Sequence, residues 1–339
     1  MQKQLKQFEG NEEAIMARRL ISSSRSEIQT MTAKELKESI WASEGRTVLC
    51  QNFVGHSLCE GTTNAEISQA FGADMIFFNG YSMDESVHQN GLLVEEWNEE
   101  KKTYETKEYR LKDMKKLINV PLGIYLECGL GDDKGTSTSP EKENVRADRV
   151  ASEENLKKAV QEGCDFIVLA GNPGTRTNFS TIIEATRRAK SIVKDEMLLF
   201  AGKWEDGVHE KVIGDPQLPM EEHKKFVKDL IDAGADVICV PMPGCRPGIN
   251  VEDIREIVTY VHTYKPTTLV MSFLDCSVEG ADNQSIRQCT LWSKMTGADI
   301  HAIGDAGLSG MSSPEGIYTM SIALKGRRLT FRRLAAGRR

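Results

Sequence analysis

A short phrase that recurs four times constrains the fold of this chain more than any other feature. Each copy has a glycine, an alanine or cysteine, an aspartate and then apolar residues, and the copies occupy residues 71–76, 162–167, 233–238 and 296–300. Glycine is typical of the residue after a helix, and a short apolar run is typical of a buried strand. Each copy therefore predicts that a helix ends and a strand begins, and the repetition predicts a series of α/β units.

Apolar segments between the copies complete the pattern. Strands are predicted at residues 46–53, 121–128, 198–204 and 268–275, and amphipathic helices at 154–161, 181–193, 220–233, 251–264 and 285–295. Strands this apolar are expected in a parallel sheet that is covered on both faces. Eight of them alternating with helices predict an α/β fold, the (β/α)8 TIM barrel. A doubly wound open sheet is the alternative, but no GxGxxG motif follows the first strand, which argues against its dinucleotide-binding form.

The domain organisation follows from this pattern. Residues 1–30 are predicted to be an N-terminal extension, and residues 31–339 a single barrel domain. A helix at 31–40, with Thr32 as its cap and Glu35 in the capping-box position, is expected to close the bottom of the barrel. The repeated aspartates lie at the N-terminal ends of strands, where barrels place residues for stability, so no catalytic role is expected for them.

Two segments are too long to be simple loops. Residues 81–120, after the second strand, contain a predicted β-hairpin in which 93–97 pair with 103–109. Residues 129–150, after the third strand, are rich in Gly, Asp, Ser, Thr and Lys, and this long loop is interpreted as a mobile lid. Both segments could equally be surface decoration or a subunit contact, and residues 92–109 are the candidate surface for a homo-oligomer.

Composition excludes several classes of protein. No apolar run approaches the roughly 18 residues of a membrane span, and the N-terminus lacks a secretory signal, so we expect a cytoplasmic protein with no membrane partner. The net charge of −7 argues against nucleic-acid binding, although residues 325–333 are strongly basic. That basic stretch is interpreted as a solvated helix end or an interface, with contact to a phosphorylated ligand as a lesser alternative. The eight cysteines show no zinc or disulfide spacing and are expected to be reduced.

A glycine-rich stretch follows the last predicted strand, at residues 301–316. Glycines strip side chains from the turn, and Ser312 or Ser313 followed by Pro314 is typical of a helix start. Exposed backbone amides and the positive end of a helix dipole favour an anion, and TIM barrels often bind phosphate after strands seven and eight. The turn therefore predicts a phosphate-binding site; the alternative is a tight turn that binds nothing. The predicted ligand contacts are Gly304, Ala306, Gly307 and Gly310.

Chemistry in a TIM barrel occurs at the C-terminal ends of the strands, so polar residues at those positions are the candidates for the site. Ligand-binding roles are predicted for those without an obvious catalytic function: Asn79, Asn172, Arg176, Arg246 and Ser272. Catalytic roles are predicted for His56, Glu127, Lys203 and Asp275. Gln51, Asn52, Thr175, Glu205 and Asp305 complete the set of polar residues near strand ends.

Three chemistries can be built from these side chains. Lys203 could form a Schiff base with a carbonyl substrate, or could simply pair with a carboxylate. Glu127, Asp275 and Asp305 could hold Mg²⁺, because hard oxygen ligands suit that ion. His56 or Glu127 could serve as the acid or base of an isomerisation, although a single histidine in a loop is often an exposed bystander. Apart from Mg²⁺, no cofactor is expected.

Several segments resemble an uncharacterised bacterial family of TIM-barrel proteins, some of which are labelled phosphoenolpyruvate phosphonomutase-like. They are residues 31–37, 42–47, 63–66, 71–75 and the stretch from Gly304 to Arg328, so the resemblance covers nearly the whole chain. It implies the barrel fold. Phosphonomutase-type enzymes resemble one another in an acidic Mg²⁺ site after the second and third strands and in a gating loop with a Lys-Cys pair. Here Asn79 follows the second strand and no Lys-Cys dipeptide occurs, so the resemblance implies a phosphorylated or carboxylated ligand and not the mutase reaction.

These features together predict a lyase or isomerase that acts on a small phosphorylated metabolite at the C-terminal face of the barrel. The alternative is a non-catalytic barrel that senses a ligand or acts as a scaffold, with the hairpin and the basic tail binding protein partners.

Overall fold

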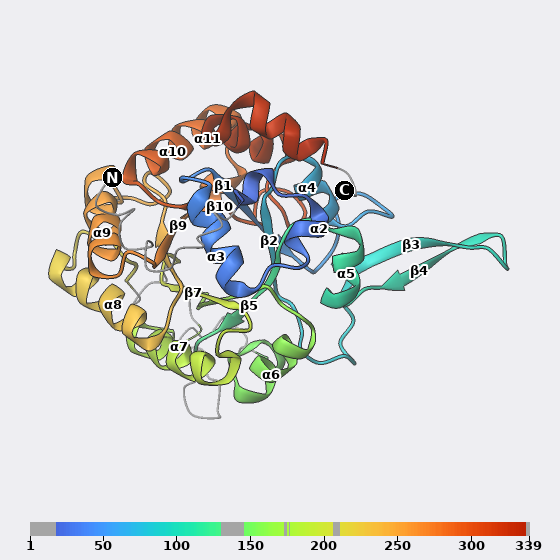
Figure 1. Cartoon of the computed structure of the whole chain (residues 1–339), viewed down its shortest axis with the longest axis horizontal. Helices are drawn as coiled ribbons and strands as arrows, with labels where there is room; N and C mark the ends of the chain where they lie inside the picture. The colour runs from blue at the N-terminus through green and yellow to red at the C-terminus, as the bar shows by residue number, and fades with distance from the viewer. Residues whose placement is uncertain (1–17, 130–145, 173–174, 176, 206–210, 337–339) are drawn as a thin grey trace, which may run out of the picture.

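Eight parallel strands close into a barrel in this computed structural model, which describes residues 18–129, 146–172, 175, 177–205 and 211–336 (Figure 1). The order around the barrel is β1-β10-β9-β8-β7-β6-β5-β2, so strands that follow one another in the chain are neighbours. The strands are β1 (Thr47–Phe53), β2 (Met75–Asn79), β5 (Leu122–Glu127), β6 (Phe166–Ala170), β7 (Leu198–Gly202), β8 (Val237–Pro241), β9 (Leu269–Leu274) and β10 (Ile300–Ile303). The predicted TIM barrel is confirmed.

One helix follows each strand, and these helices form the outer ring of Figure 1. They are α4 (Asn64–Ala70), α5 (Leu111–Leu117), α6 (Glu153–Gln161), α7 (Phe179–Val193), α8 (Met220–Ala233), α9 (Val251–Tyr264), α10 (Asn283–Thr296) and α11 (Pro314–Leu334). Local signals fix their ends. Thr63 and Glu66 form a capping box at the start of α4, whereas Gly234 and Gly297 end α8 and α10 at φ values of 107° and 88° that suit glycine.

The interior of the barrel is filled by its own strands. Large inward side chains such as Phe77, Phe166, Phe200 and Phe273 are fully buried and belong to one apolar cluster. A second apolar cluster lies between the strands and the helices. Packing both faces of the sheet in this way accounts for the nearly continuous apolar strands in the sequence.

Helix α3 (Ala33–Ala42) closes the N-terminal end of the barrel, as predicted, and lies in front of the strands in Figure 1. Thr32 and Glu35 form its capping box, and Leu36 and Ile40 join the cluster inside the barrel. Residues before it also pack here: Leu20 is fully buried and belongs to the same cluster. The N-terminal segment expected to be an extension is therefore part of the barrel floor from Leu20 onward.

The repeated aspartates have one structural task in common. Asp74, Asp165, Asp236 and Asp299 accept hydrogen bonds from the backbone amides of Val48, Leu122, Leu199 and Val270, at 2.9, 2.8, 3.2 and 2.8 Å. In each case the acceptor precedes an even strand of the barrel and the donor lies near the start of the odd strand beside it. The repeat thus joins the N-terminal ends of strands in pairs.

Only part of the basic stretch of residues 325–333 is solvated as interpreted, because Arg327, Arg328 and Arg332 are exposed but two other cations are not. Lys325 and Arg333 are buried in α11 and both form ion pairs with Asp74. Asp74 is completely buried, so it needs such cations close by. These two side chains serve the N-terminal end of the barrel and are remote from any ligand at its mouth.

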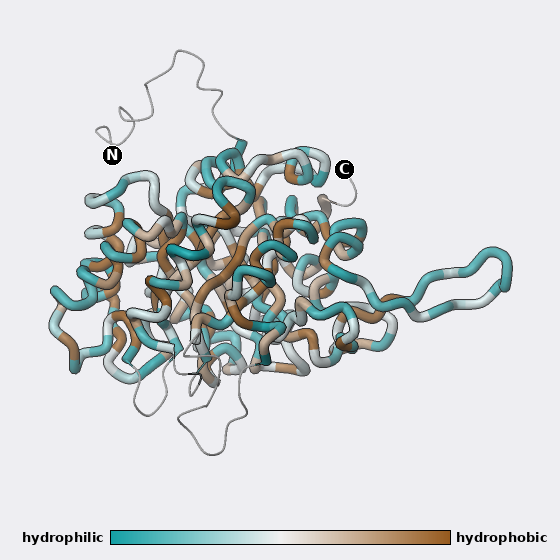
Figure 2. Tube along the Cα trace, turned by 90° about the horizontal axis from the view of Figure 1, so that it is seen from below, coloured by the Kyte–Doolittle hydropathy of each residue, from teal (hydrophilic) through white to brown (hydrophobic). Residues whose placement is uncertain are grey.

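Strands β3 (Leu93–Asn98) and β4 (Thr103–Glu108) form a separate antiparallel pair between β2 and α5. The pair extends away from the barrel (Figure 2). Trp97 and Tyr104 face each other across it with ring centroids 5.2 Å apart, and both are exposed. Within the described residues, no helix is long and apolar enough to cross a membrane. Most of the predicted lid, residues 130–145, lies outside the described residues.

Candidate functional site

Five acidic side chains gather at the C-terminal end of the barrel. Glu127 ends β5, Glu205 lies three residues after β7, Asp275 follows β9 directly, and Asp305 lies two residues after β10. The fifth, Glu279, belongs to a short 3-10 helix, η4 (Cys276–Gly280). Because all eight strands are parallel, their ends bring these carboxyl groups to one mouth of the barrel.

Glu205, Asp275 and Glu279 form a row of carboxyl groups in mutual contact. Asp275 is hydrogen-bonded to both glutamates. No N–H or O–H group of the described chain donates to Glu205 Oε2, Asp275 Oδ2 or Glu279 Oε2. Ionised carboxylates only accept hydrogen bonds, so these contacts need protons held between them.

Burial keeps those protons in place. Burial, followed by the charge of Asp275, raises the pKa of Glu205 well above its usual value. The same two causes raise the pKa of Glu279 to about 10. Glu279 is therefore a neutral acid at pH 7, the pKa of Glu205 is shifted in the same direction, and the row can give up a proton to a substrate.

Glu127 and Lys203 form a second group of buried ionisable side chains. Glu127 Oε2 accepts a hydrogen bond from the backbone amide of Asn172 at 3.0 Å, and Oε1 accepts from the Asn172 side chain. Burial raises the pKa of Glu127, while Asn172 and the positive charge of Lys203 oppose the rise. Lys203 is fully buried, and its Nζ donates to the carbonyl of Gly171 at 3.0 Å. These contacts place the side chains of Glu127, Lys203 and Asn172 close together at the ends of β5, β6 and β7.

Asp305 lies opposite, between β10 and the ends of β1 and β2. Its Oδ2 accepts a hydrogen bond from Asn79 Nδ2 at 3.0 Å. Burial raises the pKa of Asp305, whereas hydrogen bonds from Gln51 and Asn79 lower it. Asn79 thus orients Asp305 and lowers its pKa by donating a hydrogen bond to it.

Several buried polar atoms at this end of the barrel have no partner in the described chain. Besides the carboxyl oxygens above, they include Gln51 Oε1, Tyr125 Oη and Trp204 Nε1, whereas Ser272 lies on the outer face of β9. Tyr125 and Trp204 are in ring contact at 6.3 Å, and Trp204 contacts Phe273 at 5.0 Å. Buried polar atoms are rarely left unpaired, and functional sites are where the exceptions collect. The mouth therefore has the composition of a binding site, with an aromatic wall and convergent polar groups.

The glycine turn predicted to bind phosphate contains a carboxyl group of the chain itself. The Ala306 amide donates to Glu279 Oε1 at 2.6 Å, and a side chain at Gly304 would place its first carbon 1.8 Å from Glu279 Oε2. Gly307 packs against Gly280, and the Gly310 carbonyl accepts a hydrogen bond from Phe53 at 2.8 Å. This corrects the expectation of an open anion site, because Glu279 takes the amide that a phosphate would need. Only the helix start is as predicted, with Ser313 as the cap and Pro314 first in α11.

The remaining predicted residues are dispersed. His56 is exposed in the loop after β1, where its carbonyl accepts a hydrogen bond from Asn64 at 3.2 Å. Arg246 is partly buried, and its Nε donates to the Trp204 carbonyl at 2.7 Å. Arg176 lies outside the described residues. Glu279 was missed because it belongs to no strand end; its only signal in the sequence is that it follows Asp275 by four residues.

The three predicted metal ligands are held by different neighbours. Glu127 is hydrogen-bonded to Asn172, Asp275 to the two glutamates, and Asp305 to Asn79. No group of three or more His, Cys, Asp or Glu residues in the described ranges is placed to hold a metal ion. The set Glu127, Asp275 and Asp305 is thus not brought together.

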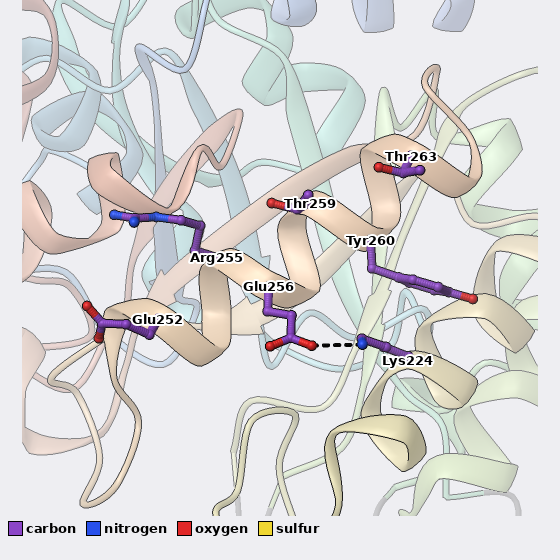
Figure 3. A pocket seen from close by; sticks show the side chains of 7 residues that line it. All are labelled: Lys224, Glu252, Arg255, Glu256, Thr259, Tyr260 and Thr263. Atoms are coloured by element: carbon purple, nitrogen blue, oxygen red, sulfur yellow. Dashed lines mark ion pairs between the residues drawn. The ribbon is translucent and has the colours of Figure 1, made fainter.

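A surface hollow lies on the outside of the barrel, away from the strand ends. It has a volume of about 440 Å³ and follows α9 where that helix meets α8 (Figure 3). Lys224 of α8 forms an ion pair with Glu256 of α9 at 2.7 Å there. The hollow is open and lined by ordinary surface residues, so it is not the candidate active site.

Comparison with known proteins gives a family and a fold. The chain belongs to the family described as Domain of unknown function (DUF7916), which matches residues 21–339, and the predicted family resemblance is confirmed at this level. The search of curated proteins gave no match.

Solved structures share the barrel at low sequence identity. The carboxyl transferase domain of Rhizobium etli pyruvate carboxylase with 3-bromopyruvate is 13% identical, with a TM-score of 0.51 over 91% of this chain and 51% of that chain. A protein described as a lyase/mutase from Burkholderia cenocepacia J2315 is 14% identical, with a TM-score of 0.43 over 79% and 80% of the two chains. Phosphonopyruvate hydrolase in complex with oxalate and Mg²⁺ is 12% identical, with a TM-score of 0.44 over 80% of each chain. The chain spans about half the length of the Rhizobium protein, and these likenesses show the fold alone.

Proposed function

We propose that this protein is an enzyme, a lyase or isomerase that moves a proton at the carbon beside the carbonyl group of a small anionic substrate. The observation that carries the proposal is the mouth itself. The positive charge of buried Lys203 lowers the pKa of Glu127, in a site that also holds Glu205 and Glu279, whose pKa values are raised by burial and by Asp275. Pairs of titratable groups whose surroundings separate their pKa values are typical of acid and base catalysis.

Each group has a role that suits its surroundings. Glu127, which is oriented by two hydrogen bonds from Asn172, is the proposed base that removes the proton. Lys203 would stabilise the negative charge that then develops on the carbonyl oxygen of the substrate. Alternatively, its amine would attack the carbonyl carbon and, with loss of water, form a Schiff base. Glu205, whose pKa is raised well above its usual value by burial, is the proposed acid that returns the proton.

The substrate class is inferred from the charged and acidic groups at the mouth. Positive charge from Lys203 and the acidic protons of the row suit a small oxo acid, carboxylated or phosphorylated. The Rhizobium carboxyl transferase domain was solved with pyruvate and with 3-bromopyruvate, so 2-oxo acids of three to five carbons are the first compounds to test.

Deuterium exchange tests this proposal directly. In D₂O, the wild-type protein should accelerate loss of the C3 proton signal of a 2-oxo acid in NMR spectra. Glu127→Gln should slow that exchange at least about 100-fold, because general base catalysis contributes that much. Glu252→Gln, a surface change on α9, is the matched control and should exchange as the wild type does.

Two results would end the proposal or redirect it. Exchange no faster than buffer for a panel of carboxylated and phosphorylated oxo acids would refute catalysis. If such compounds bound without exchange, the barrel would be a ligand sensor. Borohydride reduction followed by mass spectrometry of the Lys203 peptide separates the Schiff-base role from the charge-stabilising role.

Magnesium belongs to the proposal as a cofactor to be tested at the carboxyl row. Glu205 and Asp275 are in contact and offer unpartnered oxygens, and Mg²⁺ is often held by two carboxylates with water. Such an ion would displace the proton of Glu205, so metal binding and the acid role of Glu205 are alternatives. A bound ion would supply positive charge for an enolate oxygen. Calorimetric titration with MgCl₂ should give heat that Glu205→Gln removes; unchanged heat in that variant would exclude this pair as the ligands.

A further inference from the structure

A second hollow lies beside the mouth, at the ends of β1 and β2. Its volume is about 210 Å³, large enough for a carboxylate or a phosphate with a short chain. Its walls include Phe53, Gly55, Gly80, His88, Arg146 and Arg149. None of these positions was singled out by the sequence.

The lining of this hollow is positively charged. Among the described residues that line it, Arg146 and Arg149 are cationic and none is acidic. Arg146 Nε donates to Asp148 at 2.9 Å, and His88 forms an ion pair with Glu108. Arg149 Nε is buried and has no hydrogen-bond partner in the described chain. Arg149 is partly exposed and lines the hollow, so its guanidinium group is available to an anion there.

The positive charges of the two arginines repel each other. Burial lowers the pKa of Arg149 and the nearby charge of Arg146 lowers it further, while Asp148 and Glu127 oppose both effects. Two neighbouring positive charges attract an anion more strongly than one, and two guanidinium groups offer paired N–H donors to its oxygens.

The apolar wall of the hollow is fixed in place by two glycines. A side chain at Gly55 would place its first carbon 2.4 Å from the Phe53 ring, and one at Gly80, which has a φ of 74°, would place it 2.5 Å away. The ring therefore lies against both glycine backbones, which holds this wall and the adjoining strand ends in one geometry.

The hollow is linked to the candidate active site through the chain around Arg149. Val150 pairs with Glu127 in an isolated parallel bridge, and the Ala151 amide donates to the Glu127 carbonyl at 2.9 Å. Arg149 is thus one residue from the segment hydrogen-bonded to the proposed base, and its pKa responds to the charge of Glu127.

We infer that the hollow lined by Arg146 and Arg149 binds the oxyanion end of a small ligand, a carboxylate or a phosphate group. That this ligand is also the substrate rests on the proposed function. The anion site is thus placed at the ends of β1 and β2, which adjoin β10, and not in the glycine turn after β10, where Glu279 takes the Ala306 amide.

Titration calorimetry with inorganic phosphate and, separately, with oxalate tests the site and distinguishes the two sources of oxyanion. The tighter of the two should bind at least about tenfold more weakly to Arg149→Met than to the wild type, because hydrogen bonds to charged groups are among the strongest in proteins. Arg149→Lys keeps the charge and loses the paired donors, so its affinity should fall between those two. Arg255→Met, in the hollow on α9, is the matched control and should bind as the wild type does.

Equal affinity in Arg149→Met and the wild type, with both folded by circular dichroism, would overturn this inference. The same holds if neither anion binds the wild type at millimolar concentration. The two proposals fail separately. Anion binding that depends on Arg149, in a protein with no deuterium exchange, supports the anion site and refutes the enzyme. Exchange that is unaffected by Arg149→Met refutes the anion site as part of catalysis and leaves Glu127 and Lys203 in place.

Discussion

The two ends of this barrel treat their acidic residues in opposite ways. At the N-terminal end each repeated aspartate faces a cation: Lys115 bonds Asp165 at 2.8 Å, Lys37 bonds Asp236 at 2.8 Å, and His262 bonds Asp299 at 3.0 Å. Asp74 has Lys325 and Arg333. At the C-terminal end, Asp275 faces two other carboxyl groups instead.

The acidic residues at the N-terminal end of the sheet stabilise the fold, whereas those at the C-terminal end are suited to proton transfer. A paired carboxylate that also accepts a backbone hydrogen bond holds strand ends in register and has no reason to change its charge. A carboxyl group that is buried beside others keeps a proton and can transfer it, and the cost is a less stable fold when that proton is lost. Changes at each end should therefore have different consequences.

The largest effect is expected at Asp74. Asp74→Ala would leave Lys325 and Arg333 buried without their carboxylate, and breaking a buried ion pair costs about 3–5 kcal/mol. Urea denaturation should show this loss in the free energy of unfolding. Asp195→Ala, which removes an exposed pair with Lys190, should cost less than about 1 kcal/mol. Equal losses for the two variants would contradict the special role of the N-terminal end.

A smaller effect, dependent on pH, is expected at the mouth. Glu279 has a pKa of about 10 in the fold and 4.5 as an ordinary group, so the folded chain keeps a proton that the unfolded chain loses between those values. Its contribution to stability is thus complete below pH 4.5 and disappears as pH rises toward 10. One such proton gives a slope of at most about 1.4 kcal/mol per pH unit. Glu279→Gln should flatten the decline of unfolding free energy from pH 6 to 9, and an unchanged slope would refute the protonated row.

The smallest effect is expected at His262. Burial lowers the pKa of this histidine, but the hydrogen bond and charge of Asp299 outweigh it, and the net shift is upward from 6.5. The stabilisation is therefore complete below pH 6.5 and lost as pH rises through the higher folded value. His262→Gln should cost up to about 1 kcal/mol near pH 5.5 and close to nothing near pH 9. A cost that grows with pH would reverse the sign assigned to this pair.

Local signals made much of the fold predictable. Gly234 and Gly297 end α8 and α10 because the left-handed backbone there suits glycine. Thr63 and Glu66 form the capping box that starts α4. Each of these signals involves residues only a few positions apart. The hairpin strands pair across a turn of four residues, so their partner is also local. Strand ends with Glu127, Lys203 and Asp275 could be placed at the mouth once the barrel was inferred.

The parts of the site that could not be predicted depend on contacts between distant residues. Glu279 reaches the Ala306 amide across 27 positions in sequence, and Lys325 reaches Asp74 across 251. A basic stretch and a glycine turn have the same appearance in sequence whether they face solvent, a ligand or another part of the chain.

By itself, the sequence determined the barrel, because helix caps, buried strands and a repeated junction are set by neighbours along the chain. The tertiary structure alone decided which charges are neutralised, since electrostatic interactions depend on distance in space. For this reason the sequence did not show that Asp74 pairs with Lys325 and Arg333, or that Glu279 occupies the turn expected to bind phosphate. Nor did it show that Arg149 lies beside the mouth.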